Sequence, residues 1–196
     1  MGLDSVELLM RFEKEFKKDV PDQDAGNIST VGDMANWFFN NLPIHQPDKR
    51  VRDTIINSLK DAFIKLNLRN NIDYEHTIGD IIPKNDLINT WKGLERELNL
   101  KIPELNPQDL TEKELKEVKV LGLTISRPKP PILDMEFHRF VECVGALNYE
   151  KFVDFDNLTS LFEITIAVIG ITQEQCGIDI DEVFVDSSFT YDLGLD

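Results

Sequence analysis

Ser5 is the residue whose type and position best suit covalent chemistry. It follows Asp4 at the beginning of a predicted amphipathic helix over residues 3–17. Free backbone N–H groups and the helix dipole favour negative charge at such a terminus, so this setting suits a phosphodiester on Ser5, provided that its hydroxyl is exposed. The structural alternative for the same residue is an N-cap, whose side chain accepts a backbone hydrogen bond.

The helix over residues 3–17 is predicted from the spacing of its apolar side chains. They recur every three or four residues, which places them on one face: Val6, Leu9, Met10, Phe12 and Phe16. The same helix carries four acidic side chains: Asp4, Glu7, Glu13 and Glu15. A solvent-facing helix surface accounts for acidic residues in this position.

No other cluster has the spacing of a catalytic or metal site. The three histidines, His45, His76 and His138, lie in separate segments and are predicted to be ordinary surface or partly buried residues. The acidic cluster at residues 179–186 lacks the glycine and the terminal Glu of a calcium-binding loop. The sequence also has no Gly-rich phosphate loop, nucleophile elbow or Cys–His pair. Neither catalytic residues nor metal ligands are therefore predicted.

Composition and charge narrow the class of protein. Apolar residues make up 41% of the 196 residues, which is enough for a packed core. The net charge of -15 argues against nucleic acid or an anionic membrane surface as a partner. Cys143 and Cys176 are predicted to be reduced core thiols. Because no signal peptide or long apolar run is recognised, we expect a cytoplasmic protein.

Most of the remaining chain is also predicted to be helical. The expected helices cover residues 28–42, 50–66, 86–98, 110–118, 137–147 and 161–176. The apolar face of the helix over residues 50–66 should consist of Ile55, Leu59, Phe63 and Ile64. The first of these should begin with a capping box, in which Ser29 or Thr30 pairs with Asp33. Gly177 should end the last one. A short strand is expected over residues 118–125. Loops are expected through residues 77–80 and, as an ordered loop, after Gly177.

The sequence at the end of one predicted helix is similar to a second segment further along the chain. Residues 12–21 align without a gap with residues 94–103, and both segments end in proline. The similar positions are those that determine the helix and the point at which it ends. It predicts an internal repeat of two related helical units, although short amphipathic helices also resemble one another without being related.

The two ends of the chain together carry a family resemblance. The tail reads Ile180-Asp181-Glu182-Val183, Asp186-Ser187-Ser188-Phe189 and Asp192-Leu193-Gly194-Leu195-Asp196. The head continues with Leu3-Asp4-Ser5-Val6-Glu7-Leu8-Leu9-Met10, Val20-Pro21-Asp22 and Ile28-Ser29-Thr30-Val31-Gly32-Asp33. Joined tail to head, these segments resemble the acyl carrier protein family from the loop after helix I to the final helix. The helices of that family would therefore occur here in permuted order.

The resemblance implies an all-α fold with an acyl-carrier-like four-helix bundle and a second, degenerate carrier-like unit. Residues 158–196 would supply helix I and its loop, and residues 1–47 would supply helices II to IV. Residues 48–127 would form the degenerate unit, and residues 128–157 a linker with a short helix. The bundle would close either within one chain or by domain swapping in a homodimer.

The resemblance gives two answers for the attachment of 4′-phosphopantetheine. The segment Gly2-Leu3-Asp4-Ser5 is similar to the Gly-x-Asp-Ser of the family and points to Ser5. The serine of the family usually stands five residues before the Glu of a Val-Glu-Leu segment, and that count from Glu7 falls on Gly2, which has no hydroxyl. In the second unit the matching positions are Leu87 and Lys84, neither of which can carry the group.

The function that the resemblance implies is that of a non-catalytic acyl-carrier-like protein in an acyl-transfer pathway of the fatty-acid or polyketide kind. Intermediates would be held as thioesters on the arm at Ser5. The acidic helix, with Asp4, Glu7, Glu13 and Glu15, would bind a phosphopantetheinyl transferase and basic-faced acyl-transfer enzymes. The alternative is a structural or protein-interaction module that keeps the carrier fold and has lost the arm. Neither interpretation predicts an enzyme.

Overall fold

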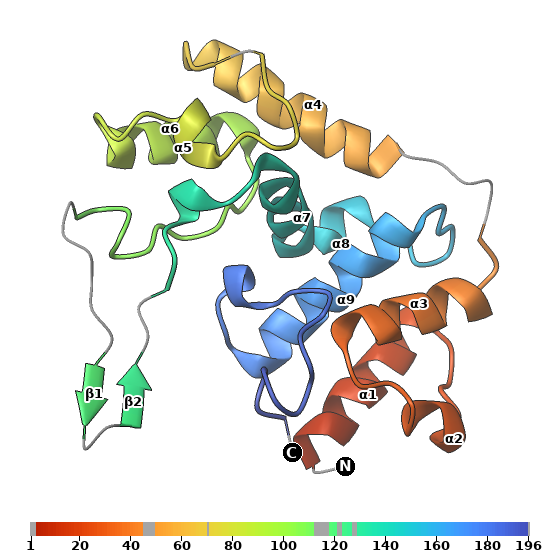
Figure 1. The fold of residues 1–196 in the computed structure, drawn as a ribbon. Helices are drawn as coiled ribbons and strands as arrows, with labels where there is room; N and C mark the ends of the chain where they lie inside the picture. The colour runs from red at the N-terminus through yellow and green to blue at the C-terminus, as the bar shows by residue number, and fades with distance from the viewer. Residues whose placement is uncertain are drawn as a thin grey trace. The chain divides into compact units, whose positions relative to one another are not determined.

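The computed structural model describes residues 3–44, 50–69, 71–111, 118–120, 123–126 and 129–195. Within these ranges the regular structure is helical apart from one two-stranded hairpin, as expected for an all-α fold (Figure 1). The chain forms two compact units. Unit 1 comprises Met1–Ile56 with Glu142–Asp196, and unit 2 comprises Asn57–Val141.

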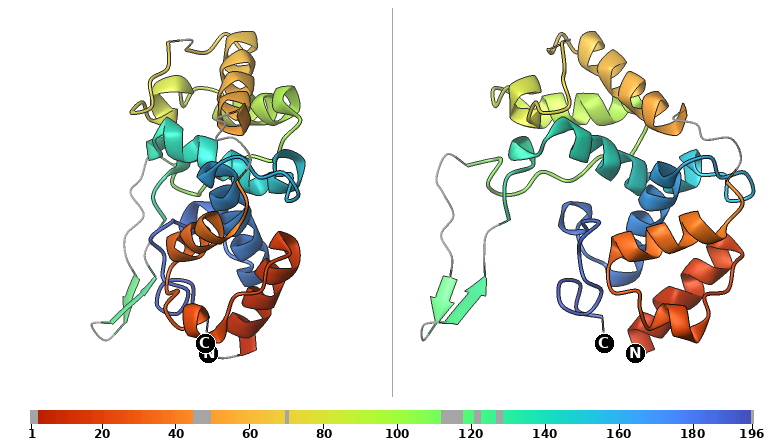
Figure 2. Two further views of the ribbon diagram at one scale, coloured as in Figure 1. Left: turned by 90° about the vertical axis from the view of Figure 1, so that its right-hand side faces the viewer. Right: turned by 45° about the vertical axis from the view of Figure 1, so that its right-hand side comes forward.

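Unit 1 is built from helices that come from both ends of the sequence. They are α1 (Leu3–Phe16), α2 (Asp22–Ala25), α3 (Val31–Asn41), α8 (Tyr149–Phe152), α9 (Leu161–Cys176) and the 3-10 turn η2 (Ile180–Glu182). Helix α9 packs against α1, α3 and α8. Figure 2 shows the red and orange helices of the head beside the blue helix of the tail. Head and tail therefore share one core.

Aromatic rings and the central helix form that core. The rings of Phe16 and Phe38 stack at 4.1 Å between centroids, and Phe12 meets Phe38 edge to face at 6.4 Å. All residues of α9 from Glu163 to Thr172 are buried. A helix that is apolar all round has to be covered on every side. This explains why α9 lies in the middle of unit 1.

Local signals explain where the helices of unit 1 begin and end. The predicted capping box of Thr30 and Asp33 is confirmed at the start of α3. Gly177, with a φ of 65°, ends α9 as predicted. Helix α1 ends at Phe16, one residue before its predicted end, because Lys17 takes a left-handed φ of 52° and the Lys18 N–H donates to the Glu13 carbonyl at 3.0 Å.

Unit 2 contains shorter helices and the hairpin. Its elements are α5 (Ile78–Ile81), α6 (Leu87–Leu98), β1 (Val118–Val120), β2 (Leu123–Ser126) and the 3-10 turn η1 (Ile132–Asp134). The ring of Trp91 packs edge to face on Phe140 at 5.8 Å, and its Nε1 donates to the Pro103 carbonyl at 3.0 Å. Helices α4 (Arg50–Lys65) and α7 (Phe137–Leu147) each contain a boundary between the units.

Several expectations for unit 2 need correction. Residues 77–80, expected in a loop, begin α5 with a second capping box, in which the Thr77 and Asp80 side chains bond each other's backbone N–H. The expected strand over residues 118–125 is an antiparallel pair of strands. Ile64, which we placed on the apolar face of α4, is 54% exposed. Residues 112–117 of the expected helix 110–118 lie outside the described residues.

The chain is also divided at other points than expected. The segment 128–157, predicted as a linker with a short helix, contains that helix as α7, and it also contains η1 and α8. Its side chains Phe140, Val141 and Val144 are buried because their spacing places them on one face of α7, and Tyr149 of α8 is buried as well. This segment therefore contributes to the cores of the units.

Each unit contains a bridge of three backbone hydrogen bonds, and the bonded residues have the same spacing along the sequence in both units. In unit 1 it consists of Phe189 N–H to Ser29 O at 3.0 Å, Val31 N–H to Ser187 O at 3.1 Å and Gly32 N–H to Val185 O at 2.6 Å. In unit 2 it consists of Ile78 N–H to Met135 O at 2.8 Å, Phe137 N–H to His76 O at 2.8 Å and His138 N–H to Tyr74 O at 3.4 Å. Each bridge joins a loop to the start of a helix, α3 in one unit and α7 in the other.

Candidate functional site

The candidate site is a cavity in unit 1 that lies between the head and the tail of the chain. Helices α1 and α2, the start of α3 and residues 188–195 enclose about 340 Å³. The backbone bridge between the tail loop and α3 holds two of these walls together. Apolar and hydroxyl side chains line the cavity, and Ser5 is one of them.

Ser5 lies within α1 and not before it. Because α1 includes Leu3, Ser5 is not the residue that caps this helix, so the N-cap alternative is wrong. Its side chain is half-buried and belongs to the cavity wall, whereas the attachment chemistry led us to expect an exposed hydroxyl. Gly2, the other candidate for the attachment position, lies outside the described residues.

The four acidic residues of α1 do not form one surface. Asp4 and Glu7 are exposed and Glu15 is half-buried. At about 100° per residue, these three fall within an arc of roughly 80° around the helix axis. Glu13 lies more than roughly 100° away from each of them, and its Oε1 accepts a hydrogen bond from the Val20 N–H at 2.7 Å. Glu13 therefore helps to fix the loop after α1.

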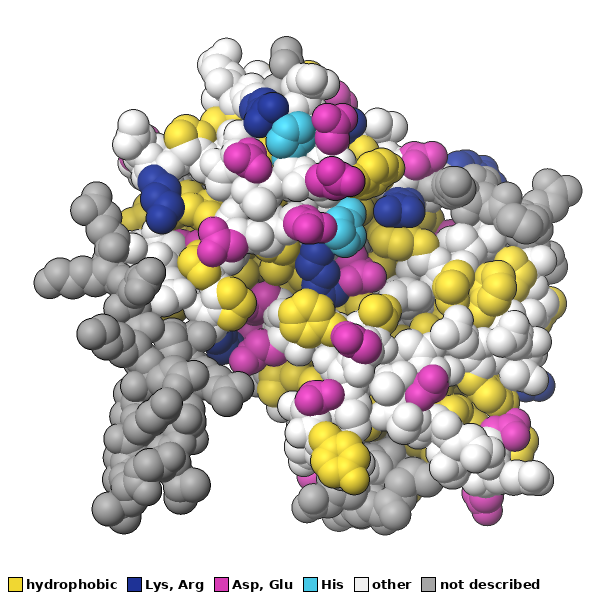
Figure 3. All heavy atoms as spheres, in the orientation of Figure 1, with side chains coloured by type: hydrophobic (Ala, Val, Ile, Leu, Met, Phe, Trp, Pro, Cys, Tyr) yellow, Lys and Arg dark blue, Asp and Glu magenta, His cyan; other side chains and the backbone are white. Residues whose placement is uncertain are grey.

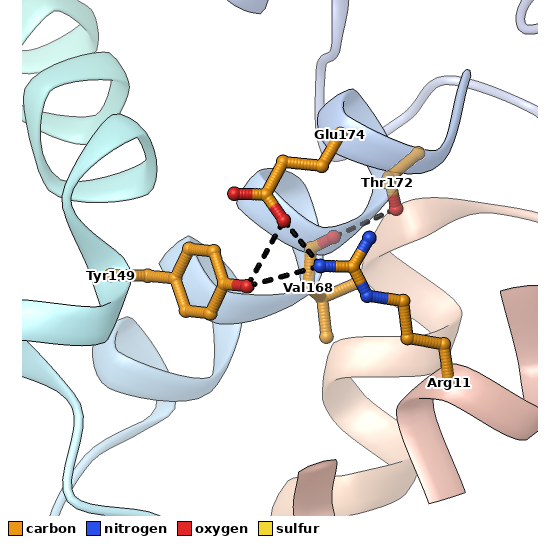
Figure 4. A network of polar contacts seen from close by, with 5 residues as sticks. All are labelled: Arg11, Tyr149, Val168, Thr172 and Glu174. Atoms are coloured by element: carbon orange, nitrogen blue, oxygen red, sulfur yellow. Dashed lines mark hydrogen bonds and ion pairs between the residues drawn. The ribbon is translucent and has the colours of Figure 1, made fainter. Parts of the chain in front are cut away.

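A polar network that the sequence did not predict holds α1 in place (Figure 4). The Arg11 guanidinium forms an ion pair with Glu174 and donates to the Tyr149 hydroxyl at 3.4 Å. The Tyr149 hydroxyl in turn donates to Glu174 at 3.2 Å. Burial, together with the Glu174 carboxylate, raises the pKa of Tyr149 to about 12, so this hydroxyl keeps its proton at neutral pH. The network joins α1, α8 and α9.

The cysteines are not positioned as nucleophiles. Both are free, Cys143 buried and Cys176 half-buried. Burial raises the pKa of the Cys176 thiol, and the Asp4 carboxylate adds to that effect. A thiol with a raised pKa has little of the thiolate form that attacks substrates or binds metals. Among the described residues there is also no group of three His, Cys, Asp or Glu side chains that could hold a metal ion.

Three further findings concern the charge of the chain and the length of its helices. Acidic side chains occur over much of the face of the described residues shown in Figure 3. The sequence contains no Lys, Arg or His from residue 152 to residue 196, the stretch that supplies the tail side of the cavity. None of the helices in the described part of the chain is long and apolar enough to cross a membrane.

The chain is similar to two curated acyl carrier proteins from Porphyromonas gingivalis, one from strain ATCC 33277 and one from strain W83. Each is 52% identical over 41 residues, which are 21% of this chain and 53% of the relative. The chain thus spans about half the length of the curated relatives that it matches. No protein-family model and no solved structure matches it. These findings support an acyl-carrier-like relation over part of the chain.

Proposed function

We propose that this chain is a non-catalytic acyl-carrier-like protein that acts in an acyl-transfer pathway of the fatty-acid or polyketide kind. The observation that carries this proposal is the 52% identity to acyl carrier proteins over 41 residues. At this level of identity, a shared role is a reasonable inference for the matched part. The kind of pathway follows from the resemblance to acyl carrier proteins.

The carrier unit in this proposal is unit 1, assembled in permuted order from α9, α1, α2 and α3. The packing of α9 on α1 and α3, and the bridge between the tail loop and α3, support this order. Unit 2 would be the degenerate copy in direct order, with α4, α6 and α7. Its bridge has the same spacing as that of unit 1, and α4 and α9 both contain 16 residues. Its matching positions are the exposed Lys84 and the buried Leu87.

The attachment point in this proposal is Ser5, which would carry 4′-phosphopantetheine. Partner enzymes would be a phosphopantetheinyl transferase and basic-faced acyl-transfer enzymes. They would bind the surface that Asp4, Glu7 and Glu15 share. Glu13 was part of the predicted docking set, but its hydrogen bond to Val20 gives it a role in the fold. The acidic charge also leads us to propose that neither nucleic acid nor a membrane is a partner.

A second candidate function is a protein-interaction module that keeps the carrier fold without the arm. The half-buried position of Ser5 in the cavity wall favours it, because a transferase needs an accessible hydroxyl. The count from Glu7 to Gly2 points the same way. In both candidates the unit closes within one chain, or between two chains by domain swapping.

A measurement of the intact mass distinguishes the two candidate functions. The protein is incubated with a phosphopantetheinyl transferase, Mg²⁺ and coenzyme A, and the intact mass is then recorded. The carrier proposal expects the mass to rise by one arm, the Ser5→Ala variant to show no rise, and the Ser29→Ala variant to behave like the unchanged protein. Ser29 is the matched control because it is exposed and lines the same cavity. No rise, while a known acyl carrier protein is modified in the same tube, would leave the interaction module as the function.

A further inference from the structure

Another hollow of unit 1 lies between α2 and α3 and is lined mostly by amide side chains. Its volume is about 440 Å³, within the range of ligand sites, about 300–1,000 Å³. The lining residues that α3 supplies recur every three or four residues, so they share one face of that helix. We call this surface the amide groove, and its side chains include those of Asn27, Asn36, Trp37, Asn40 and Asn41.

The three asparagines of α3 are unfavourable for the helix that contains them. Asn36, Asn40 and Asn41 are exposed, and at exposed helix positions alanine, glutamate or lysine gives a more stable helix. An asparagine amide lowers helix propensity because it competes for backbone hydrogen bonds. Among the described residues, the side chains of Asn36 and Asn40 have no hydrogen-bond partner. The fold therefore does not account for these amides, whereas recognition of a ligand does.

The indole of Trp37 is held in one orientation within the amide groove. Its Nε1 donates to Asp24 Oδ2 at 3.0 Å, and its ring meets that of Phe38 edge to face at 5.2 Å. The side chain is half-buried, so part of it stays in contact with solvent. Along α3 it stands between Asn36 and Asn40. The groove thus combines an apolar ring surface with amides that both donate and accept hydrogen bonds.

Two other amides of the groove are oriented by hydrogen bonds to the backbone. Asn27 Nδ2 donates to the Gln23 carbonyl at 2.9 Å, and Asn41 Nδ2 donates to the Trp37 carbonyl at 2.9 Å. Each of these amides keeps its oxygen as an acceptor and a second N–H as a donor. Because the amides are already oriented, a ligand that binds them does not have to order them first.

The charged groups of the amide groove are negative. Asp24 and Asp33 line it, and among the described lining residues there is no Lys, Arg or His. Although burial acts in the other direction, hydrogen bonds from Ser29 and Thr30 keep the pKa of Asp33 below its usual range, so this carboxyl is ionised at neutral pH. The groove would therefore repel a ligand that carries a phosphate or a carboxylate.

We infer that the amide groove binds a neutral saccharide, with the C–H face of a sugar ring on the Trp37 indole and the sugar hydroxyls on the amides and carboxylates around it. A sugar hydroxyl both donates and accepts, which matches an amide that does the same. The carboxylates of Asp24 and Asp33 accept hydroxyl protons in charge-assisted hydrogen bonds. This binding goes beyond the proposed carrier role, because it involves neither Ser5 nor the arm.

The test is a titration of the full chain, labelled with ¹⁵N, with the methyl glycosides of glucose, galactose and mannose. Binding is read from the indole N–H signal of Trp37, which is assigned by its loss in Trp37→Phe. We expect at least one glycoside to shift this signal to saturation. The indole signal of Trp91 is the internal control and should not move, because Trp91 is buried in unit 2.

Two comparison ligands test the chemistry of recognition. The first is the uronic acid form of the glycoside that binds best, in which a carboxylate replaces the hydroxymethyl group. We expect it to bind at least about tenfold more weakly, equivalent to 1.4 kcal/mol. The second is adenosine, whose base can stack on Trp37 and pair with an amide. The inference is overturned if no neutral glycoside saturates the Trp37 signal, or if the uronic acid form or adenosine binds as tightly as the best glycoside.

Asn40→Ala separates a role in binding from a role in the fold. Loss of this amide should raise the dissociation constant of the best glycoside about fivefold, whereas the midpoint of urea denaturation should stay unchanged or rise, because alanine is the better helix former. Asn57→Ala is the matched control, since Asn57 is exposed on α4 and does not line the groove, and its dissociation constant should equal that of the unchanged protein. Equal affinity in both variants, or a lower midpoint for Asn40→Ala, would contradict the inference.

Discussion

Replacing Gly170 with alanine is expected to cost unit 1 about 3 kcal/mol of unfolding free energy, at the upper end of what overpacking costs in a core. A Cβ at this position would lie 2.4 Å from Tyr149 Cδ1 and 2.5 Å from the Ala146 carbonyl oxygen. One of these atoms is backbone, so rotation of a side chain cannot relieve both contacts. Helix α9 would have to move away from α8 and from the end of α7, and the core would open.

Gly26→Ala is the matched control for this prediction. Gly26 has a φ of -65°, and an added Cβ would be 3.5 Å from its nearest neighbour, the Asp22 carbonyl oxygen. Its stability should change by no more than about 0.5 kcal/mol. Both variants are compared with the unchanged protein by urea denaturation, read by circular dichroism. A Gly170→Ala protein as stable as the Gly26→Ala protein would show that α9 is not packed on Tyr149 and Ala146 as described.

Replacing Asp109 with alanine is expected to cost unit 2 about 4 kcal/mol. Asp109 is 4% exposed, and its carboxylate accepts three backbone N–H groups, from Asn106 at 2.8 Å, Ile132 at 3.0 Å and Leu133 at 2.9 Å. These bonds close the base of the segment that carries β1 and β2. Alanine would leave three buried donors without an acceptor, and each such loss costs about 1–3 kcal/mol.

Two further variants separate the acceptor role of Asp109 from the effect of its charge. Asp109→Asn keeps one acceptor oxygen and should lose less stability than Asp109→Ala. Asp134→Ala removes an exposed carboxylate in the adjoining 3-10 turn and should change stability by about 0.5 kcal/mol or less. The measurement is again urea denaturation, with tryptophan fluorescence recorded in a Trp37→Phe background so that Trp91 alone reports unit 2. If Asp109→Ala matches Asp134→Ala, the carboxylate does not hold this segment together.

Much of the helical structure was predictable from the sequence, because the signals are local. The apolar spacing in residues 161–176, followed by Gly177, gave the bounds of α9, and residues 137–147 gave those of α7. The end of α1 was predicted one residue too late, because a lysine at a left-handed position carries no strong signal. The start of α5 was missed although its signal was present: Thr77 and Asp80 have the spacing of Thr30 and Asp33.

The candidate site was predictable only in part, because its walls come from opposite ends of the sequence. The resemblance brought Ser5 and the tail loop together, and the cavity does contain both. Thr190, which also lines the cavity, carries no pattern of its own. The Arg11, Tyr149 and Glu174 network was missed for the same reason, since its three members are spread over α1, α8 and α9. Single side chains that meet across such sequence distances leave no periodic signal.

The central claim is that the head and the tail of this chain form one carrier-like unit, and the rings of Phe12 and Phe189 test it most directly. Their centroids are 6.4 Å apart, although the residues lie in α1 and in the tail loop. We predict a nuclear Overhauser effect between the two rings in the monomeric protein. To record only contacts within one chain, uniformly labelled protein is diluted into an excess of unlabelled protein. A domain-swapped dimer would give the opposite result. The effect would be lost when labelled chains are diluted into unlabelled ones, and it would appear between two differently labelled chains. Its absence in both experiments would contradict the claim.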